Sequence, residues 1–105
     1  MSEIAIVTDS TADIPDELLE KYNIHVVTNY VIIDGKSLKD GEDISRREFY
    51  ERLPGMNPLP TTAAASSGEY EQLYAKLLHK GANNILSIHC SSLLSGIYNA
   101  ARVAA

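Results

Sequence analysis

The chain has 105 residues, of which 45% are hydrophobic and 22% are charged. This composition excludes a disordered or collagen-like chain, and the length predicts one small domain over residues 1–105. Fourteen acidic against nine basic residues give a net charge of −5, which argues against binding nucleic acid or docking on anionic membrane. Cys90 is the single cysteine, so no internal disulfide is expected. With no signal-peptide pattern and no transmembrane segment in the sequence, a cytoplasmic location is predicted.

A short strand and a helix are predicted at the start of the chain. Ile4–Val7 is an apolar, β-branched run that ends in the polar segment Thr8–Thr11, a pattern typical of a buried strand entering a loop. Pro15 sets φ for a first helical turn, and apolar residues recur at helical spacing as far as Tyr22, which is expected in the core. Asn23 predicts the end of this helix, because asparagine tolerates a left-handed closing residue.

Two strands and a second helix are predicted next. Ile24–Val27 and Tyr30–Ile33 are strand-like, and the Asp34-Gly35 pair predicts a hairpin turn because glycine adopts positive φ without steric cost. Ser45 and Glu48 have the spacing of a capping box, which predicts the start of a helix. The prolines after this helix predict an extended connection up to residue 60.

The last third of the chain predicts a long helix, a strand and a further helix. A capping box beginning at Ser66 starts the long helix, and Tyr70 and Tyr74 lie on its apolar face, where they are expected in the core. Ile85–His89 predicts a second buried strand. A small-residue helix is expected from about Leu94, with no stop signal before the last residue.

Alternating strands and helices predict an α/β fold with a mostly parallel sheet flanked by helices. In such sheets, ligands bind beyond the carboxyl ends of the strands. Two polar loops should lie at that edge, Thr8–Thr11 after the first strand and Cys90–Ser92 after the late strand. The sequence therefore predicts a candidate site where these two loops meet.

Serine and threonine hydroxyls gather in three clusters along the chain. Their members are Thr8, Ser10 and Thr11; Thr61, Thr62, Ser66 and Ser67; and Ser91, Ser92 and Ser95. Hydroxyls together with the free N–H groups of a helix start can hold a carboxylate or a phosphate without Lys or Arg. Ordinary helix capping is the alternative interpretation of each cluster taken alone.

Other candidate residues favour structural interpretations. Asp9 could serve as a nucleophile or a metal ligand, but an Asx-turn is favoured for an aspartate in such a loop. Cys90 is expected to be a small buried apolar residue, because it and His89 should point to opposite faces of a strand. The three histidines share no metal-ligand spacing, and the scattered glycines form no nucleotide-binding fingerprint. No metal and no cofactor are therefore expected.

The segment Ile4–Pro15 resembles the opening of the DegV family of bacterial fatty-acid-binding proteins. The resemblance continues through Pro60-Thr61-Thr62, with Ser66 and Gly68, and again through Ser87–Asn99. These three motifs occur in the family's order and with its gaps. The resemblance covers nearly all of this chain but only the amino-terminal part of the family's length, which implies a DegV-type amino-terminal domain without the second domain.

The resemblance implies a lipid carrier without catalysis of its own. In the family, hydroxyls of the first domain hold the carboxylate of a long-chain fatty acid, and some members present that carboxylate to a separate fatty-acid kinase subunit. The residues implied for carboxylate binding are Thr62 and Ser92, with Ser91 and Ser95 nearby and Ser10 and Thr11 in support.

Two alternatives to a carrier follow from the residues. One is a phosphoryl- or acyl-transfer enzyme with Asp9 or Ser92 as its nucleophile, although no general base is evident beside either. The other is a truncated domain that binds no ligand and self-associates through an exposed apolar face, as large apolar patches do.

Overall fold

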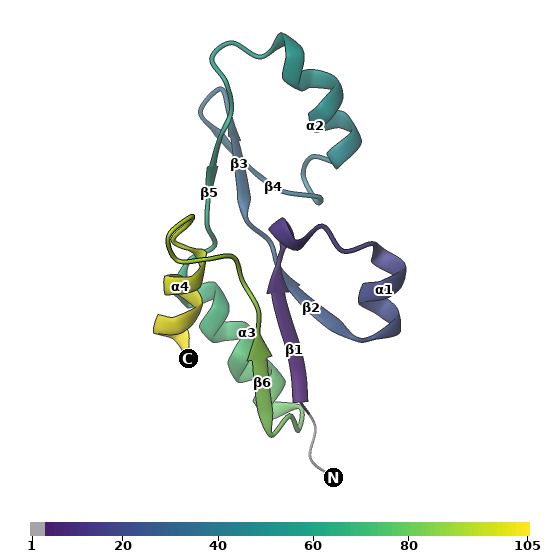
Figure 1. The fold of residues 1–105 in the computed structure, drawn as a ribbon, viewed down its shortest axis with the longest axis vertical. Helices are drawn as coiled ribbons and strands as arrows, with labels where there is room; N and C mark the ends of the chain where they lie inside the picture. The colour runs from purple at the N-terminus through teal and green to yellow at the C-terminus, as the bar shows by residue number, and fades with distance from the viewer. Residues whose placement is uncertain (1–3) are drawn as a thin grey trace.

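Six strands form two separate three-stranded sheets in the computed structural model, which describes residues 4–105 (Figure 1). The strands are β1 (Ile4–Asp9), β2 (Ile24–Val27), β3 (Tyr30–Ile33), β4 (Lys36–Lys39), β5 (Thr61–Ala63) and β6 (Asn84–Ser87). The helices are α1 (Asp16–Lys21), α2 (Arg46–Arg52), α3 (Ser67–His79) and α4 (Ile97–Ala104), with short 3-10 turns at Ser10–Ala12 and Leu53–Gly55. The predicted α/β class is confirmed.

The first sheet is parallel, with β1 in the centre. β2 pairs with one side of β1, with Ile6 opposite Ile24, and β6 pairs with the other side, with Ala5 opposite Ile85. The chain thus leaves β1 for a neighbour on one side and later returns on the other, which makes the carboxyl end of β1 a topological switch point. The predicted strand Ile85–His89 runs instead from Asn84 to Ser87, which leaves His89 in the loop.

The second sheet is antiparallel and was predicted only in part. The expected hairpin is present: Asp34 (φ 50°) and Gly35 (φ 79°) turn β3 into β4, and paired positive φ angles match the twist of hairpin strands. The third strand, β5, was not predicted, and it pairs with β3 with Thr62 opposite Val31. A strand of three residues after a proline-rich segment is too short for a periodic signal.

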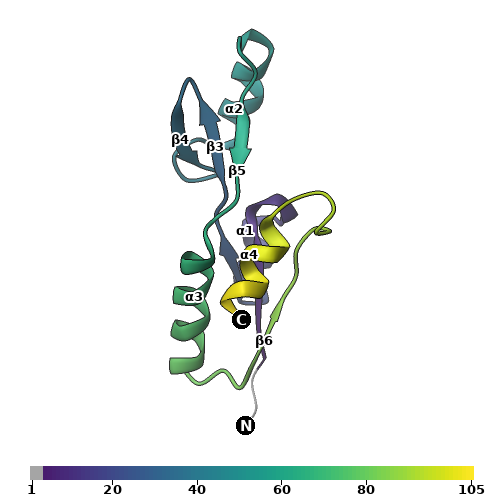
Figure 2. The same cartoon turned by 90° about the vertical axis from the view of Figure 1, so that its left-hand side faces the viewer.

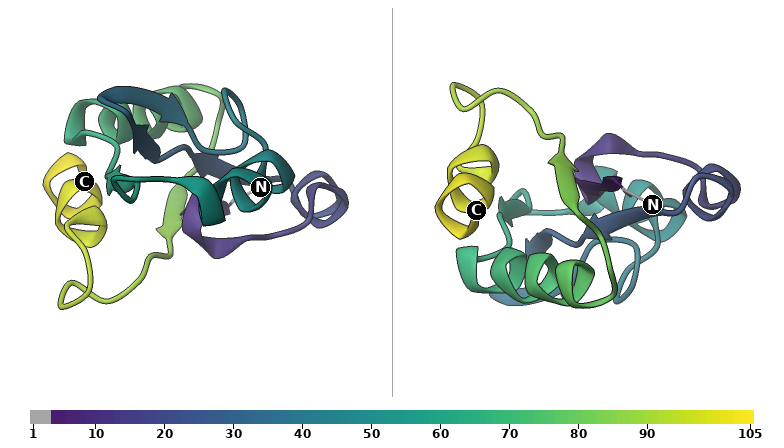
Figure 3. Two further views of the ribbon diagram at one scale, coloured as in Figure 1. Left: turned by 90° about the horizontal axis from the view of Figure 1, so that it is seen from above. Right: turned by 90° about the horizontal axis from the view of Figure 1, so that it is seen from below.

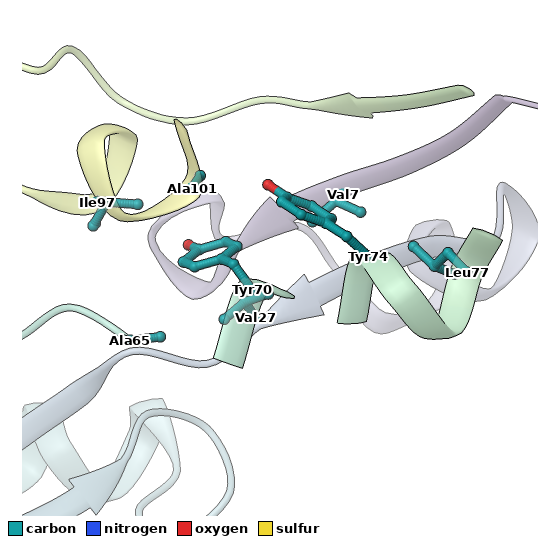
Figure 4. Packing of buried hydrophobic residues seen from close by; sticks show 8 residues of the cluster. All are labelled: Val7, Val27, Ala65, Tyr70, Tyr74, Leu77, Ile97 and Ala101. Carbon is teal, nitrogen blue, oxygen red and sulfur yellow. The ribbon is translucent and has the colours of Figure 1, made fainter. Parts of the chain in front are cut away.

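Two hydrophobic cores lie in the two halves of a molecule that measures 52 × 29 × 22 Å. The larger core packs α3 and α4 against one face of the parallel sheet, with Tyr70 and Tyr74 at its centre as predicted (Figure 4). The smaller core joins Val31, Ile33 and Ile44 under the antiparallel sheet. The expected single domain therefore contains two centres of packing.

Helix ends follow the predicted signals with two corrections. α3 has the full capping box, with Glu69 N donating to Ser66 Oγ and Ser66 N donating to Glu69 Oε2. At α2 only half of the box forms, because Ser45 Oγ accepts from Glu48 N while the Glu48 carboxylate lies 4.0 Å from an arginine instead. α4 begins at Ile97 rather than near residue 94.

α1 lies at the β2 edge of the parallel sheet and buries none of its residues (Figures 1 and 3). Asn23 ends it in the left-handed conformation (φ 51°), as predicted. Tyr22 is exposed, so its prediction as a core residue is wrong. Tyr22 does follow the apolar residues of α1 at helical spacing, but no other part of residues 4–105 covers the face of α1 on which it lies.

One face of the parallel sheet is left open. Figures 2 and 3 show α3 and α4 on the same side of the sheet. The side chains that alternate to the other side include four exposed apolar residues, Ile4, Val26, Leu86 and Ile88. None of the helices in residues 4–105 is both long and apolar enough to cross a bilayer.

Candidate ligand-binding site

The loops after β1 and β6 lie side by side at the carboxyl edge of the parallel sheet, as predicted. Ile88 N donates to Val7 O at 2.8 Å, and Thr8 Oγ1 donates to Ile88 O at 2.8 Å. Figures 1 and 2 show that this edge faces the antiparallel sheet. The site is therefore bordered by the two loops on one side and by β5 and the start of α3 on the other.

Asp9 is the buried centre of this edge, with 1% of its surface exposed. Its Oδ1 accepts hydrogen bonds from Thr11 N (3.0 Å), from Thr11 Oγ1 and from Asn29 Nδ2 (3.1 Å). Its Oδ2 lies 2.5 Å from His89 Nδ1. The bond from Thr11 N confirms the favoured Asx-turn. Both oxygens are occupied, which leaves neither free to attack an external substrate as a nucleophile.

Asn29 joins the β1 loop to the start of α3. Its backbone N donates to Ser10 Oγ (3.1 Å), and its side-chain Oδ1 accepts from Ala65 N (3.2 Å). Its carbonyl accepts from Asp40 N at 3.0 Å. Every polar group of this buried asparagine is thus hydrogen-bonded, as burial requires.

His89 connects Asp9 to α3. Its Nε2 lies 2.6 Å from Ser87 Oγ, and Tyr74 Oη donates to the same Ser87 oxygen at 2.7 Å. The Tyr70 ring meets the imidazole edge-on, at 5.3 Å between centroids. Both imidazole nitrogens are therefore occupied, and the side chain is 2% exposed.

The order Ser87–His89–Asp9 matches the order of groups in a Ser-His-Asp catalytic triad. A catalytic serine needs space beside its oxygen for a substrate carbonyl. A cavity of about 440 Å³ is lined by Asp9 but not by Ser87 or His89, a second of about 560 Å³ is lined by none of the three, and Ser87 Oγ already accepts a hydrogen bond from Tyr74. We therefore interpret these three residues as a structural network.

The hydrogen-bond network stabilises a buried negative charge on the Asp9 carboxylate. Burial alone would raise the pKa of the Asp9 carboxyl, but the hydrogen bonds from His89 and Thr11 lower that pKa below its usual range. Burial also raises the pKa of the Tyr70 hydroxyl, which has no hydrogen-bond partner among the described residues. Asp9 is therefore ionised at neutral pH, whereas Tyr70 stays protonated.

Four of the six predicted binding residues are engaged in local hydrogen bonds. Ser10 Oγ accepts from Asn29 N, and Thr11 Oγ1 donates to Asp9. Ser91 Oγ accepts from Leu93 N, and Ser95 Oγ accepts from Ile97 N. These hydroxyls order the loops, as the capping interpretation expects.

Thr62 and Ser92 differ from the other four. Both are exposed, and neither hydroxyl has a hydrogen-bond partner within residues 4–105. Thr62 lies on β5, three residues before Ala65, and Ser92 lies three residues after His89. The buried hydrogen-bond network is thus connected to the segment that carries Thr62, through Ala65, and to the loop that carries Ser92, through His89.

The start of α3 is less available than the sequence suggests. Its capping box occupies the Ser66 hydroxyl and the Glu69 amide, and Tyr30 Oη donates to Glu69 Oε1 at 2.5 Å. The cation nearest the β1 loop is engaged too, because Arg46 donates to Ser10 O and pairs with Asp13 at 2.8 Å. Any anion held here would depend on uncharged donors.

Sequence reasoning missed Asn29 and His89 as parts of this edge. Asn29 stands between two predicted strands, where a loop asparagine is common, and His89 was assigned to a strand. The one available signal was the position of His89 directly before the hydroxyl-rich segment. Cys90 was expected to be buried; it is partly buried and packs against the larger core.

The fold and the site define an α/β domain with hydroxyl groups at the switch point of a parallel sheet. The model of the DegV protein family matches residues 3–105, and the chain belongs to this family.

Relatives of the chain are about three times longer. A DegV domain-containing protein of Listeria innocua is 44% identical over 96 residues, which are 91% of this chain and 34% of that protein. A stearic-acid-binding protein of Eubacterium ventriosum has a similar structure, with a TM-score of 0.90 at 33% identity over 97% of this chain and 35% of its own. DegV of Bacillus subtilis, a fatty-acid-binding protein, has a TM-score of 0.89 at 36% identity over 99% and 36%. The chain thus spans about a third of these proteins.

Proposed function

We propose that this chain is the part of a cytoplasmic DegV-type carrier that holds the carboxylate of a long-chain fatty acid. The observation that carries the proposal is the pair of free hydroxyls at Thr62 and Ser92, on segments tied to one buried network. Two solved relatives described as fatty-acid-binding proteins support the choice of ligand.

Uncharged donors suit this ligand. A chain with a net charge of −5 gains little from long-range attraction of an anion, so short hydrogen bonds must supply the affinity. Thr62 and Ser92 supply the direct bonds in this proposal. Ser10, Thr11, Ser91 and Ser95 support them by ordering the loops and orienting the backbone amides.

We further propose that the carrier binds without catalysis and presents the carboxylate to a separate fatty-acid kinase subunit. Both nitrogens of His89, the histidine next in sequence to the serine-rich loop, are occupied, so no free base activates Ser92. An exposed carboxylate at the edge of the sheet remains open to a second protein. Acyl phosphate formed from ATP by the kinase only in the presence of the carrier would support this role.

Removing the two free hydroxyls should weaken fatty-acid binding. We expect Thr62→Ala and Ser92→Ala each to lower the affinity for palmitate by about tenfold, the loss typical of one hydrogen bond to a charged group. Displacement of fluorescent cis-parinarate by palmitate measures this. Ser37→Ala, on the exposed strand β4, is the matched control and should bind as the wild type does. Unchanged affinity in both site variants would refute the assignment of these residues.

Self-association is a second candidate role, favoured by the open face of the parallel sheet. Leu86 and Ile88 are 52% and 54% exposed there, and burying them against a second copy would gain hydrophobic free energy. We expect the 105-residue chain to dimerise with rising concentration in light scattering, and Leu86→Asp to keep it monomeric. A wild type that stays monomeric at high concentration would exclude this role.

A further inference from the structure

The buried network at the sheet edge joins three segments that are distant in sequence. Asp9 accepts from its own loop, from Asn29 between β2 and β3, and from His89 after β6. The sequence separations are 20 residues to Asn29 and 80 residues to His89. The parallel ladder of β2, β1 and β6 aligns the strands that lead into these segments, and beyond the ends of the strands these side chains join the three segments to one another.

We call the three sets of hydrogen bonds that start at Asp9 the arms of the network: the first goes to Thr11, the second to Asn29 and the third to His89. Each arm leads to a segment that carries a proposed binding residue. The first arm orders Ser10 and Thr11 directly. The second arm runs from Asn29 to Ala65 N, two residues beyond the end of β5, the strand that carries Thr62. The third arm runs through His89 into the loop that carries Ser92.

Burial makes the hydrogen bonds of the network depend on one another. Asp9 and Asn29 are buried, and the His89 side chain is 2% exposed. Little water can therefore take the place of the Asp9 carboxylate as the hydrogen-bond acceptor of the Asn29 and His89 side chains. His89 is the ionisable side chain hydrogen-bonded to Asp9, and Tyr70 and Tyr74 from α3 contact His89 and Ser87 respectively. Loss of one arm therefore leaves the remaining bonds of Asp9 free to rearrange.

We propose that Asp9, Asn29 and His89 are positioning residues that couple the three hydroxyl-bearing segments into one carboxylate site. This inference rests on the proposed function for its ligand. None of the three needs to touch the fatty acid, because they act through the segments that carry Thr62 and Ser92.

Hydrogen exchange tests the coupling without any ligand. Asn29→Ala removes the arm to α3, and we expect the backbone amides of residues 91–95, to which Asn29 makes no hydrogen bond, to exchange about tenfold faster by NMR. In the reverse direction, His89→Gln should accelerate exchange at residues 62–65. Thr28→Ala is the matched control, since Thr28 makes only a long, exposed hydrogen bond to Glu42 (3.4 Å) and should change neither set.

A milder variant keeps the test valid if Asn29→Ala fails to fold. Ser10→Ala removes only the oxygen that accepts from Asn29 N, and it should also accelerate exchange at residues 62–65. Exchange that changes only beside each substitution would overturn the proposal.

Palmitate binding supplies a second test, in a double-mutant cycle. We expect Asn29→Ala and His89→Gln each to weaken binding by about tenfold and the double variant to lose much less than a hundredfold, because both act through Asp9. Losses that multiply would show independent effects and contradict the coupling. A wild type that binds no palmitate would refute the proposed function, while the exchange experiment would still decide whether the segments are coupled.

Discussion

Asp9→Ala should lower the free energy of unfolding by about 3–5 kcal/mol, the range measured when one partner of a buried ion pair is removed. The substitution leaves the His89, Asn29 and Thr11 donors without their shared acceptor, and of these the side chains of His89 and Asn29 are buried. Urea unfolding followed by circular dichroism measures the change.

The control for this substitution is Asp13→Ala. Asp13 also pairs with a cation, Arg46 at 2.8 Å, but both side chains are more than a third exposed. Surface pairs contribute about 0–1 kcal/mol, so the control should lose no more than that. Equal losses in the two variants would show that the burial of Asp9 has no energetic consequence.

The Asp9 pair should also make stability depend on pH at the acid end. Because the pKa of Asp9 is lowered in the folded chain, the stabilisation is complete above the unfolded pKa of about 4 and is lost as pH falls through the lower folded pKa. The difference in unfolding free energy between wild type and Asp9→Asn should therefore be constant between about pH 5 and 7 and shrink below about pH 4. A difference that stays constant to pH 2 would contradict the ionised state.

Ile44→Ala should have the second largest effect, a loss of about 2–5 kcal/mol in the free energy of unfolding. Ile44 is 2% exposed and closes the small core beneath the antiparallel sheet, where few other apolar groups can fill the space it leaves. Hydrogen exchange should show the loss chiefly in β3 and β4. The amides of β1, in the larger core, should remain protected longer.

Tyr50→Ala is the control for Ile44. Tyr50 lies on the nearby helix α2 and is 64% exposed, so its truncation should change stability by no more than about 0.5 kcal/mol. If Ile44→Ala accelerated exchange equally in both halves, the two cores would unfold as one cooperative unit.

Local sequence signals predicted most elements of the fold because each depends on a few adjacent residues. Asp34-Gly35 specifies a hairpin turn through its positive φ angles, and Ser66 with Glu69 specifies a helix start through two reciprocal hydrogen bonds. The strand β5 escaped prediction because its pairing with β3 is non-local. Tyr22 was misplaced because helical spacing identifies an apolar face but not what covers it.

Some features of the candidate site could likewise be predicted from local sequence, whereas others depend on the tertiary structure. Composition and spacing by themselves determined the α/β class, the two hydroxyl-rich loops at the sheet edge and the favoured Asx-turn at Asp9. Only the tertiary structure decided which hydroxyls are free and which are engaged, and that Asn29 and His89 meet Asp9 from 20 and 80 residues away. The physical reason is that strand and turn preferences act over a few residues, whereas a buried charge is satisfied by whichever donors the folded sheet brings to it.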